Sequence, residues 1–144
     1  MEIRTATDVD RAAAAELLRA AGLPVPADGE PPVELRVLAG EGRIAACAGF
    51  ERHDEVALLR SIVVASEARG RSHGTEIVRA TLARIDALGV AETFLVTMDA
   101  AEFFGRLGFR AVERDTVPTA VHASPEWELH LCVGGTWMRR PRSG

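Results

Sequence analysis

The stretch between residues 55 and 98 constrains the fold more than any other part of the chain. It begins with the apolar run EVALLRSIVVA (55–65), passes through the glycine-bracketed loop EARGRSHG (67–74) into an amphipathic segment, and ends with a second apolar run, TFLVTM (93–98). The first run is apolar enough at its end to be a strand buried on both faces. A strand, a loop, a helix and a strand in this order need a right-handed crossover, so the two strands should run parallel in one sheet.

The loop in the middle of this unit has the features of an anion-binding site. Residues 77–88 carry apolar side chains at helical spacing, so the loop presents unpaired N–H groups and the positive end of a helix dipole. Arg69 and Arg71 add charges suited to phosphate oxygens, while Gly70 and Gly74 let a ligand approach the backbone. These features favour a pyrophosphate. The alternative is that the arginines are solvated and the glycines merely turn the chain.

Two common phosphate-binding motifs are excluded by the residues present. The P-loop of nucleoside triphosphatases requires a lysine, and this chain contains none. The dinucleotide fingerprint G-x-G-x-x-G requires three glycines, whereas the loop has only Gly70 and Gly74, at the wrong spacing.

The rest of the chain indicates one mixed α/β domain spanning 1–144, because this length suits one complete core and is too short for two ordinary domains. Further strands are expected at 2–6, 34–40, 43–53, 109–115 and 130–140, and further helices at 8–22 and 100–107. Strands 34–40 and 43–53 should form a hairpin. The loop 23–32 holds four prolines and could cover a site. The segment 117–128 is ambiguous.

Composition narrows the class of protein. A net charge of −4 argues against general binding of nucleic acid. No apolar run approaches the length of a membrane span and no leader pattern is present, so a cytoplasmic protein without membrane contact is expected. Cys47 and Cys132 match no metal or redox spacing and are expected to be buried thiols, and no metal site is expected. There is no tyrosine, which excludes any mechanism that needs a phenol.

Three features together resemble one family. The hexapeptide R69-G-R-S-H-G74 resembles Q/R-x-x-G-x-G/A, the acetyl-coenzyme A signature of the Gcn5-related N-acetyltransferase (GNAT) superfamily. AAEFFGRLGF resembles a later helix of that family, commonly written F-Y-x-x-x-G-F, and the element order matches over essentially the whole chain. More narrowly, LLRSIVV, T-x-x-A-A-x-F-F-x-R-L-G-F and the terminal LC…MRR are similar to a subgroup encoded with arsenic-resistance genes.

The resemblance implies a fold and an activity. The fold is a central mixed, twisted sheet of about six or seven strands, with helices on both faces and splayed parallel strands at 55–65 and 93–98. The activity is acetyl-CoA-dependent N-acetylation of a small-molecule amine, with an amino acid-like or oxyanion-bearing compound as the candidate substrate. Transfer is expected to be direct, since no cysteine or serine lies in a nucleophile motif. The protein is expected to be a monomer or a homodimer.

The resemblance also implies roles in binding acetyl-CoA. The pantetheine arm should pair with the backbone of Ile62, Val63 and Val64. The pyrophosphate should be held by Arg69, Gly70, Arg71, Ser72, His73, Gly74 and Thr75. The thiol end should lie beside Phe103, Phe104 and Arg106.

Several positions depart from the family pattern. Ser72 replaces a glycine and lacks the freedom of glycine at positive φ. Phe104 stands where the family often has a tyrosine that protonates the leaving thiolate, and water, Ser61 or Cys132 could replace the phenol. Thr97 stands where many members have asparagine. These departures keep open a competing function, an acyl-CoA-binding or sensory module that has lost turnover.

The catalytic base is predicted among two residues near a turn between central strands. Glu51 and His53 alternate in register and could face one side of the sheet, and either could accept the proton of the amine. Arg60 interrupts an apolar strand, which is costly unless it is paired. It either binds an anionic group of the substrate or has an acidic neighbour. His122 and Trp127 could help to close the acceptor pocket, although surface and packing roles are favoured.

Overall fold

The computed structural model describes residues 1–129 and 134–143. Within them, seven strands form one sheet in the order β1-β2-β3-β4-β5-β7-β6. The strands are β1 (Glu2–Thr5), β2 (Glu34–Gly40), β3 (Arg43–His53), β4 (Val56–Val64), β5 (Glu92–Thr97), β6 (Arg110–Ala111) and β7 (Thr136–Pro141). The helices are α1 (Asp8–Ala20), α2 (His73–Ala87), α3 (Ala101–Gly105) and α4 (Pro125–Leu129), with 3-10 helices η1 (Ser66–Ala68), η2 (Arg114–Thr116) and η3 (Thr119–Ala123).

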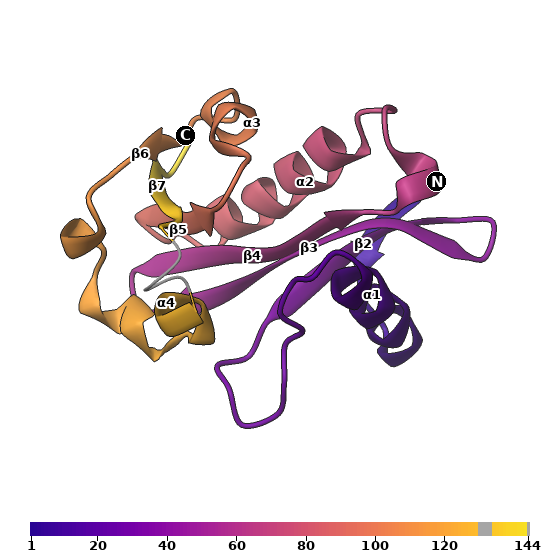
Figure 1. Cartoon of the computed structure of the whole chain (residues 1–144), viewed down its shortest axis with the longest axis horizontal. Helices are drawn as coiled ribbons and strands as arrows, with labels where there is room; N and C mark the ends of the chain where they lie inside the picture. The colour runs from indigo at the N-terminus through magenta and orange to yellow at the C-terminus, as the bar shows by residue number, and fades with distance from the viewer. Residues whose placement is uncertain (130–133, 144) are drawn as a thin grey trace.

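Helices cover both faces of the sheet, as expected. Figure 1 shows α2 and α3 on one face and α1 and α4 on the other. On the first face α2 buries the apolar stripe that its sequence predicts, and on the second α1 buries Ala14 and Leu18. A further cluster, Val56, Leu58, Phe94, Val117, Val121 and Trp137, joins the segment before α4 to the sheet.

The hairpin between β2 and β3 is confirmed. The strands pair antiparallel, and the turn residues Glu41 and Gly42 both have positive φ, at 53° and 72°. This is the turn geometry that matches the right-handed twist of a two-residue hairpin.

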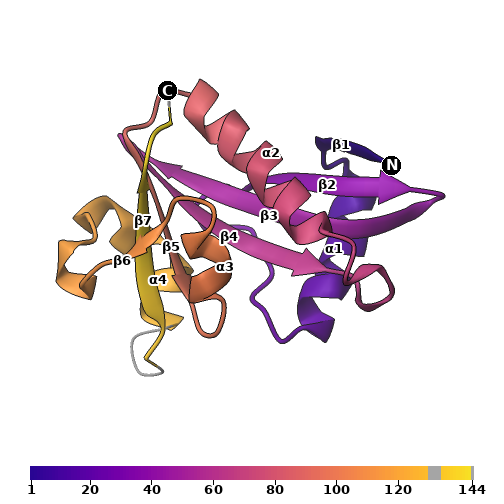
Figure 2. The ribbon, with the colours of Figure 1, turned by 90° about the horizontal axis from the view of Figure 1, so that it is seen from above.

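The parallel pair predicted from residues 55–98 is confirmed, and it is short. Among the described residues, β4 and β5 pair at three positions, from Val56 with Glu92 to Leu58 with Phe94. Both strands continue beyond this point, and Figure 2 shows β4 running away from β5. The sheet therefore opens between them.

A bulge in β4 lies at the start of this opening. Arg60 pairs with Gly49 and Val63 with Cys47, so two residues of β4 face one residue of β3. One of the two, Ser61, has a φ of 59°, which is rare for a residue other than glycine and stores backbone strain. The thiol of Cys47 donates a hydrogen bond to the Ser61 carbonyl, at 3.2 Å.

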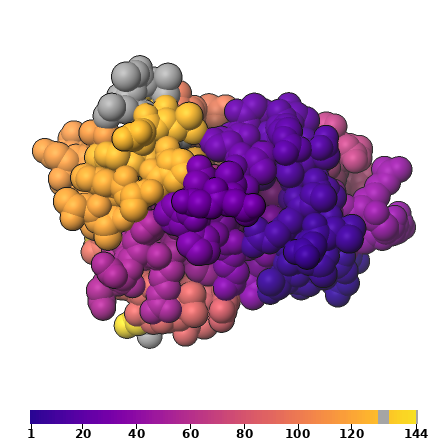
Figure 3. Space-filling model, turned by 90° about the horizontal axis from the view of Figure 1, so that it is seen from below, coloured from indigo at the N-terminus to yellow at the C-terminus, as the bar shows by residue number. Residues whose placement is uncertain are grey.

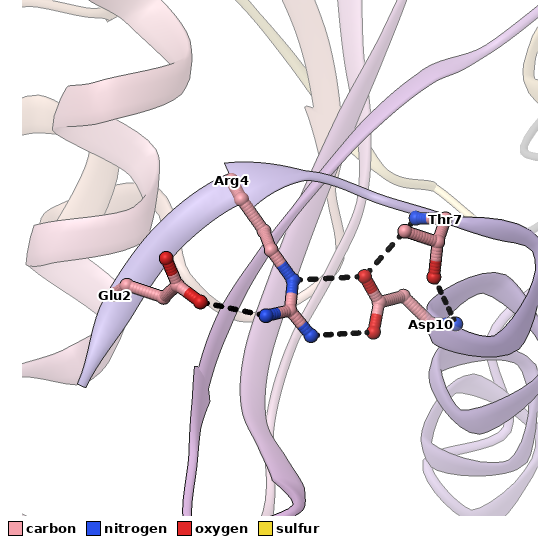
Figure 4. Close-up of polar contacts among 4 residues, drawn as sticks. All are labelled: Glu2, Arg4, Thr7 and Asp10. Atoms are coloured by element: carbon pink, nitrogen blue, oxygen red, sulfur yellow. Dashed lines mark hydrogen bonds and ion pairs between the residues drawn. The ribbon is translucent and has the colours of Figure 1, made fainter.

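The start of α1 is fixed by a capping box and an ion pair (Figure 4). The Thr7 hydroxyl accepts a hydrogen bond from the Asp10 N–H, and the Asp10 carboxylate accepts one from the Thr7 N–H. Arg4 on β1 donates two hydrogen bonds to the same carboxylate, at 3.1 and 3.0 Å. These bonds, those from Arg4 foremost, lower the pKa of Asp10 to about 2.

The C-terminal third differs from expectation. The strand predicted at 109–115 contains two strand residues, β6, and then turns into η2 before Pro118. The ambiguous segment 117–128 forms η3 and most of α4. Of the strand predicted at 130–140, the described part is β7, which begins at Thr136, and residues 130–133 lie outside the described residues. No helix in the described ranges is long and apolar enough to cross a membrane.

Candidate active site

A cavity of about 200 Å³ lies where β4 and β5 diverge. Residues 59–62 of β4 and 95–100 at the end of β5 form two of its walls, and Phe104 of α3 and Glu126 of α4 complete it together with Leu23 and Pro24. The proline-rich loop therefore contributes to the wall of a site, as its sequence suggested. Figure 3 shows this loop beside the C-terminal segment on the face that carries α1.

A larger cavity than this one lies beside α1. A hollow of about 670 Å³ lies between α1 and the β2–β3 turn, lined in part by Arg4, Asp10 and Arg43. Arg4 and Asp10 bind each other there. The divergence of β4 and β5 is the candidate active site despite its smaller volume, because Arg60 and Ser61, which line that cavity, each have a buried polar atom without a hydrogen-bond partner among the described residues.

The loop before α2 has the geometry of an anion cradle. Gly70 has a φ of 83°, and Ser72, at the N-cap of α2, has a φ of 61°. The N–H groups of the first turn, which begins at His73, have no acceptor within the helix. In the described part of the chain Arg69 and Arg71 are exposed and form no ion pair, and the Nε2 atom of His73 is buried without a hydrogen-bond partner.

Three of the residues predicted to hold the cofactor lie together at this helix end. A Cβ atom added to Gly74 would lie 3.5 Å from Cγ2 of Val64 and 3.7 Å from Cζ of Phe103. These are ordinary contact distances, so the protein itself has room for a side chain at position 74. The glycine leaves that space open beside the backbone, which is what a close-approaching ligand requires.

The remaining predicted cofactor residues extend this surface in two directions. Ile62 and Val63 lie in β4 beyond its last pairing with β5, and Thr75 lies in the first turn of α2. Arg106 and Phe103 line a second cavity of about 510 Å³ beside α3.

Phe104, which stands where the family often has a tyrosine, lies in the wall of the cavity. Phe104 is 6% exposed and makes edge contacts with Phe103 and Phe109, at 5.0 and 5.9 Å between ring centroids. Ser61 lines the same cavity, and its buried hydroxyl has no hydrogen-bond partner in the described structure. Cys132 lies outside the described residues.

Thr97, at the asparagine position, has a local structural role. Its hydroxyl accepts a hydrogen bond from the Ala100 N–H at 3.0 Å. This bond fixes the turn between β5 and α3, which carries part of the cavity wall.

Glu51 is the centre of a buried polar cluster. Its side chain is fully buried, with one oxygen 2.7 Å from Nε2 of His53. The other oxygen accepts hydrogen bonds from Nη1 of Arg60 and from the hydroxyl of Ser124, each at 2.7 Å. Glu51 and His53 do face one side of the sheet, as their register predicted, yet neither is among the described residues that line the cavity.

Arg60 connects the cluster to the cavity. Burial of this charge is balanced by Glu51, which is the acidic neighbour that the sequence left open as one alternative. Arg60 also lines the cavity, and its Nε atom is buried without a partner in the described structure.

Two residues of the site were missed in the sequence. Ser124 binds Glu51 although 73 positions separate them, and Glu126 forms part of the cavity wall. The local signal is Ser-Pro-Glu at 124–126, because serine is a preferred N-cap, proline suits the first helical position and acidic residues favour the first turn. The Ser124 hydroxyl does accept a hydrogen bond from the Glu126 N–H, at 3.1 Å.

His122 and Trp127 have packing roles. Their rings stack at 3.8 Å, Arg114 lies 3.7 Å from the ring centre of Trp127, and Trp127 contacts Trp137 at 5.2 Å. Neither His122 nor Trp127 lines the cavity among the described residues.

No group of histidine, cysteine or acidic residues in the described ranges has the geometry to hold a metal ion. Cys47 is buried as predicted, and burial raises the pKa of its thiol to about 12.

Residues 33–111 match the family model described as Acetyltransferase (GNAT) domain. The fold is similar to that of an acetyltransferase of the GNAT family from Staphylococcus aureus Mu50, with a TM-score of 0.80, 16% identity and 99% of each chain covered. It is also similar to N-acetylglutamate synthase from Neisseria gonorrhoeae in complex with coenzyme A and N-acetyl-glutamate, with a TM-score of 0.81 and 16% identity over 99% of this chain. The chain spans 35% of the length of that synthase. The ribosomal-protein-S18-alanine N-acetyltransferase from Escherichia coli aligns with a TM-score of 0.73 and 20% identity, covering 99% of this chain and 94% of its own.

Proposed function

Because the chain belongs to the GNAT acetyltransferase family, we propose that it transfers an acetyl group from acetyl-CoA directly to the amine of a small molecule. We place this reaction in the cytoplasm. Within the family, the sequence motifs point to the arsenic-resistance-associated subgroup.

The observation that carries this proposal is the divergence of β4 and β5 beside the open N-terminus of α2. After Leu58 the edge of β4 that faces β5 has lost its partner strand. An extended pantetheine arm carries amide groups, so it can pair with Ile62, Val63 and Val64 as an additional strand would. Its pyrophosphate would then reach the first turn of α2, where N–H groups and the helix dipole favour an anion.

The acceptor amine would enter from the opposite face of the sheet. The cavity passes between β4 and β5 and is bounded there by Leu23, Pro24 and Glu126. The amine can therefore approach the thioester carbon from one side while the cofactor arm lies on the other. Such positioning of two reactants in line supplies a large part of the acceleration in an acyl transfer.

Proton transfer completes the reaction. An amine attacks as the neutral species, so its ammonium proton must first be removed. Glu51 and His53, the bases that the sequence suggested, could accept this proton only through a water molecule, because neither is among the described residues that line the cavity. The departing thiolate needs no strong acid, since its conjugate thiol has a pKa near 8.5.

We propose that the amine substrate also carries an oxygen that accepts hydrogen bonds, such as that of a carboxylate or another oxyanion. Among the described residues, the Nε–H of Arg60 and the hydroxyl of Ser61 have no hydrogen-bond partner, and both residues line the same cavity. An oxygen atom of a substrate would satisfy both donors, which are otherwise costly to bury.

Ligand binding tests the cofactor assignment first. Thermal unfolding should be measured with acetyl-CoA, CoA, NAD and ATP, and the two CoA species should stabilise the protein. Gly74→Ala should unfold at the same temperature or higher without ligand, because the space is free and alanine favours a helix, yet lose most of the CoA-induced shift. Arg69→Ala should also lose it, whereas Arg52→Ala, a change of an exposed arginine on β3, should not.

Turnover is tested by thiol release over a panel of amines. The panel should include amino acids and oxyanion-bearing amines.

Absence of stabilisation by either CoA species would refute the cofactor assignment. Binding without thiol release over the whole panel would favour the second candidate, an acyl-CoA-binding module without turnover, which Phe104 at the usual place of the acid supports.

A further inference from the structure

We propose that Glu126 is the residue that takes the proton from the acceptor amine. This inference rests on the proposed acetyl transfer and assigns a catalytic group that the sequence did not indicate. It follows from the lining of the cavity between β4 and β5, from the burial of Glu126 and from the contacts that hold α4 in place.

The position of Glu126 in the cavity wall suits this role. Two carboxylates line the cavity among the described residues, Asp99 and Glu126. Asp99 is exposed, whereas Glu126 is 8% exposed. Glu126 is therefore the carboxylate of this cavity, among the described residues, that is shielded from bulk water.

The residues on both sides of Glu126 hold it in place. The Ser124 hydroxyl accepts the Glu126 N–H and donates to the buried Glu51 carboxylate, which ties the start of α4 to the centre of the sheet. On the other side, Trp127 is packed against His122 and Trp137. Ser124, two positions before Glu126, and Trp127, one position after it, are thus both fixed. A catalytic group requires such support from its neighbours.

Glu51 has a different task. Its two oxygens already bind His53, Arg60 and Ser124, at 2.7 Å each. In this arrangement Glu51 balances the charge of Arg60 and positions Ser124. Glu51 is therefore a positioning residue for α4.

The proton and electron balance is complete without a further reactant. The substrate ammonium gives one proton to the Glu126 carboxylate, and the nitrogen lone pair forms the C–N bond to the thioester carbon. As the C–S bond breaks, the sulfur leaves with its electron pair. The second proton of the nitrogen passes to the sulfur, giving the amide and free CoA thiol, and Glu126 releases its proton to solvent.

The test compares Glu126→Gln with Glu128→Gln, a matched change of an exposed carboxylate on the same short helix. The probe is thiol release from acetyl-CoA with the best amine of the panel, measured from pH 6 to pH 10. Glu126→Gln should lower kcat/KM at neutral pH by about 100-fold, within the usual range for removal of a general base. The loss should shrink as pH rises toward the pKa of the amine, because the substrate then arrives already neutral. Glu128→Gln should behave as wild type at each pH.

Stability and cofactor binding separate a chemical role from a structural one. Glu126→Gln should unfold within about 2 °C of wild type and bind acetyl-CoA equally well, and Glu126→Asp should recover part of the lost rate. A Glu126→Gln enzyme with wild-type rates overturns the assignment, as does a loss that is constant with pH. A wild-type protein that binds no CoA species and releases no thiol with any amine overturns the proposed function itself, and this assignment with it.

Discussion

Removing one partner of the buried Glu51–Arg60 pair should destabilise the protein far more than removing both. Both side chains are almost entirely buried and lie 2.7 Å apart. Glu51→Leu leaves the Arg60 guanidinium buried without its counter-charge, which costs about 3–5 kcal/mol. That is a large share of the roughly 5–15 kcal/mol that stabilises a domain. At about 3 °C per kcal/mol for a chain of this size, the Tm should fall by about 10–15 °C.

The double variant Glu51→Leu/Arg60→Met should recover most of this loss. It removes both charges and keeps apolar volume, so the remaining deficit comes from Ser124 and His53, which lose a partner worth about 1 kcal/mol each. The measurement is urea unfolding followed by circular dichroism, with Glu16→Leu as a control because Glu16 forms an exposed ion pair with Arg19 that is worth little. A single variant that loses less than about 1 kcal/mol, or a double variant less stable than the single, would refute the reasoning.

Three further changes test other features. Ser72→Gly should raise the free energy of unfolding by about 0.5–1 kcal/mol, because a left-handed serine is strained and glycine is not, and should tighten acetyl-CoA binding; a lower Tm would contradict this. Phe104→Tyr should raise kcat and leave acetyl-CoA affinity unchanged, since it places a proton donor in the cavity wall; an unchanged kcat would show that the leaving thiolate needs no donor there. Asp10 has a folded-state pKa of about 2, below its ordinary 3.8, so its contribution to stability is complete above pH 4 and is lost as pH falls through 2. The advantage of wild type over Asp10→Asn in urea unfolding should therefore be present at pH 6 and shrink progressively as pH falls from 4 through 2.

The element order could be predicted because each signal is local. The amphipathic spacing in α2 and the Gly-Glu-Gly turn of the β2–β3 hairpin are set by residues close together in the chain. The strand predicted at 109–115 was wrong after Ala111 because alternating side chains do not reveal that the chain leaves the sheet edge there. It turns instead toward Val117, which is buried against the opposite face.

The site was predicted in part for the same reason. Glu51 and His53 share a face because strand residues two positions apart do so, and the pairing of Arg60 follows from the neighbouring strand. The role of Ser124 depends on a contact across 73 positions, which no local pattern contains. Glu126 was missed because an acidic residue beside a tryptophan is ordinary on a surface helix, and only the tertiary fold turns it toward the cavity.

The short pairing between β4 and β5 divides the sheet into two parts, β1 to β4 and β5 to β7, which are joined at three residue pairs among the described residues. Any molecule that lies in the opening contacts both parts of the sheet and restrains their relative motion. The entropy of that restraint is lost once, so the first of two ligands to bind lowers the cost for the second. Cofactor and acceptor should therefore bind with positive cooperativity through the stiffness of the sheet, even where they do not touch. Slower amide exchange at Val63, Val64 and Leu95 on binding either ligand would be its signature.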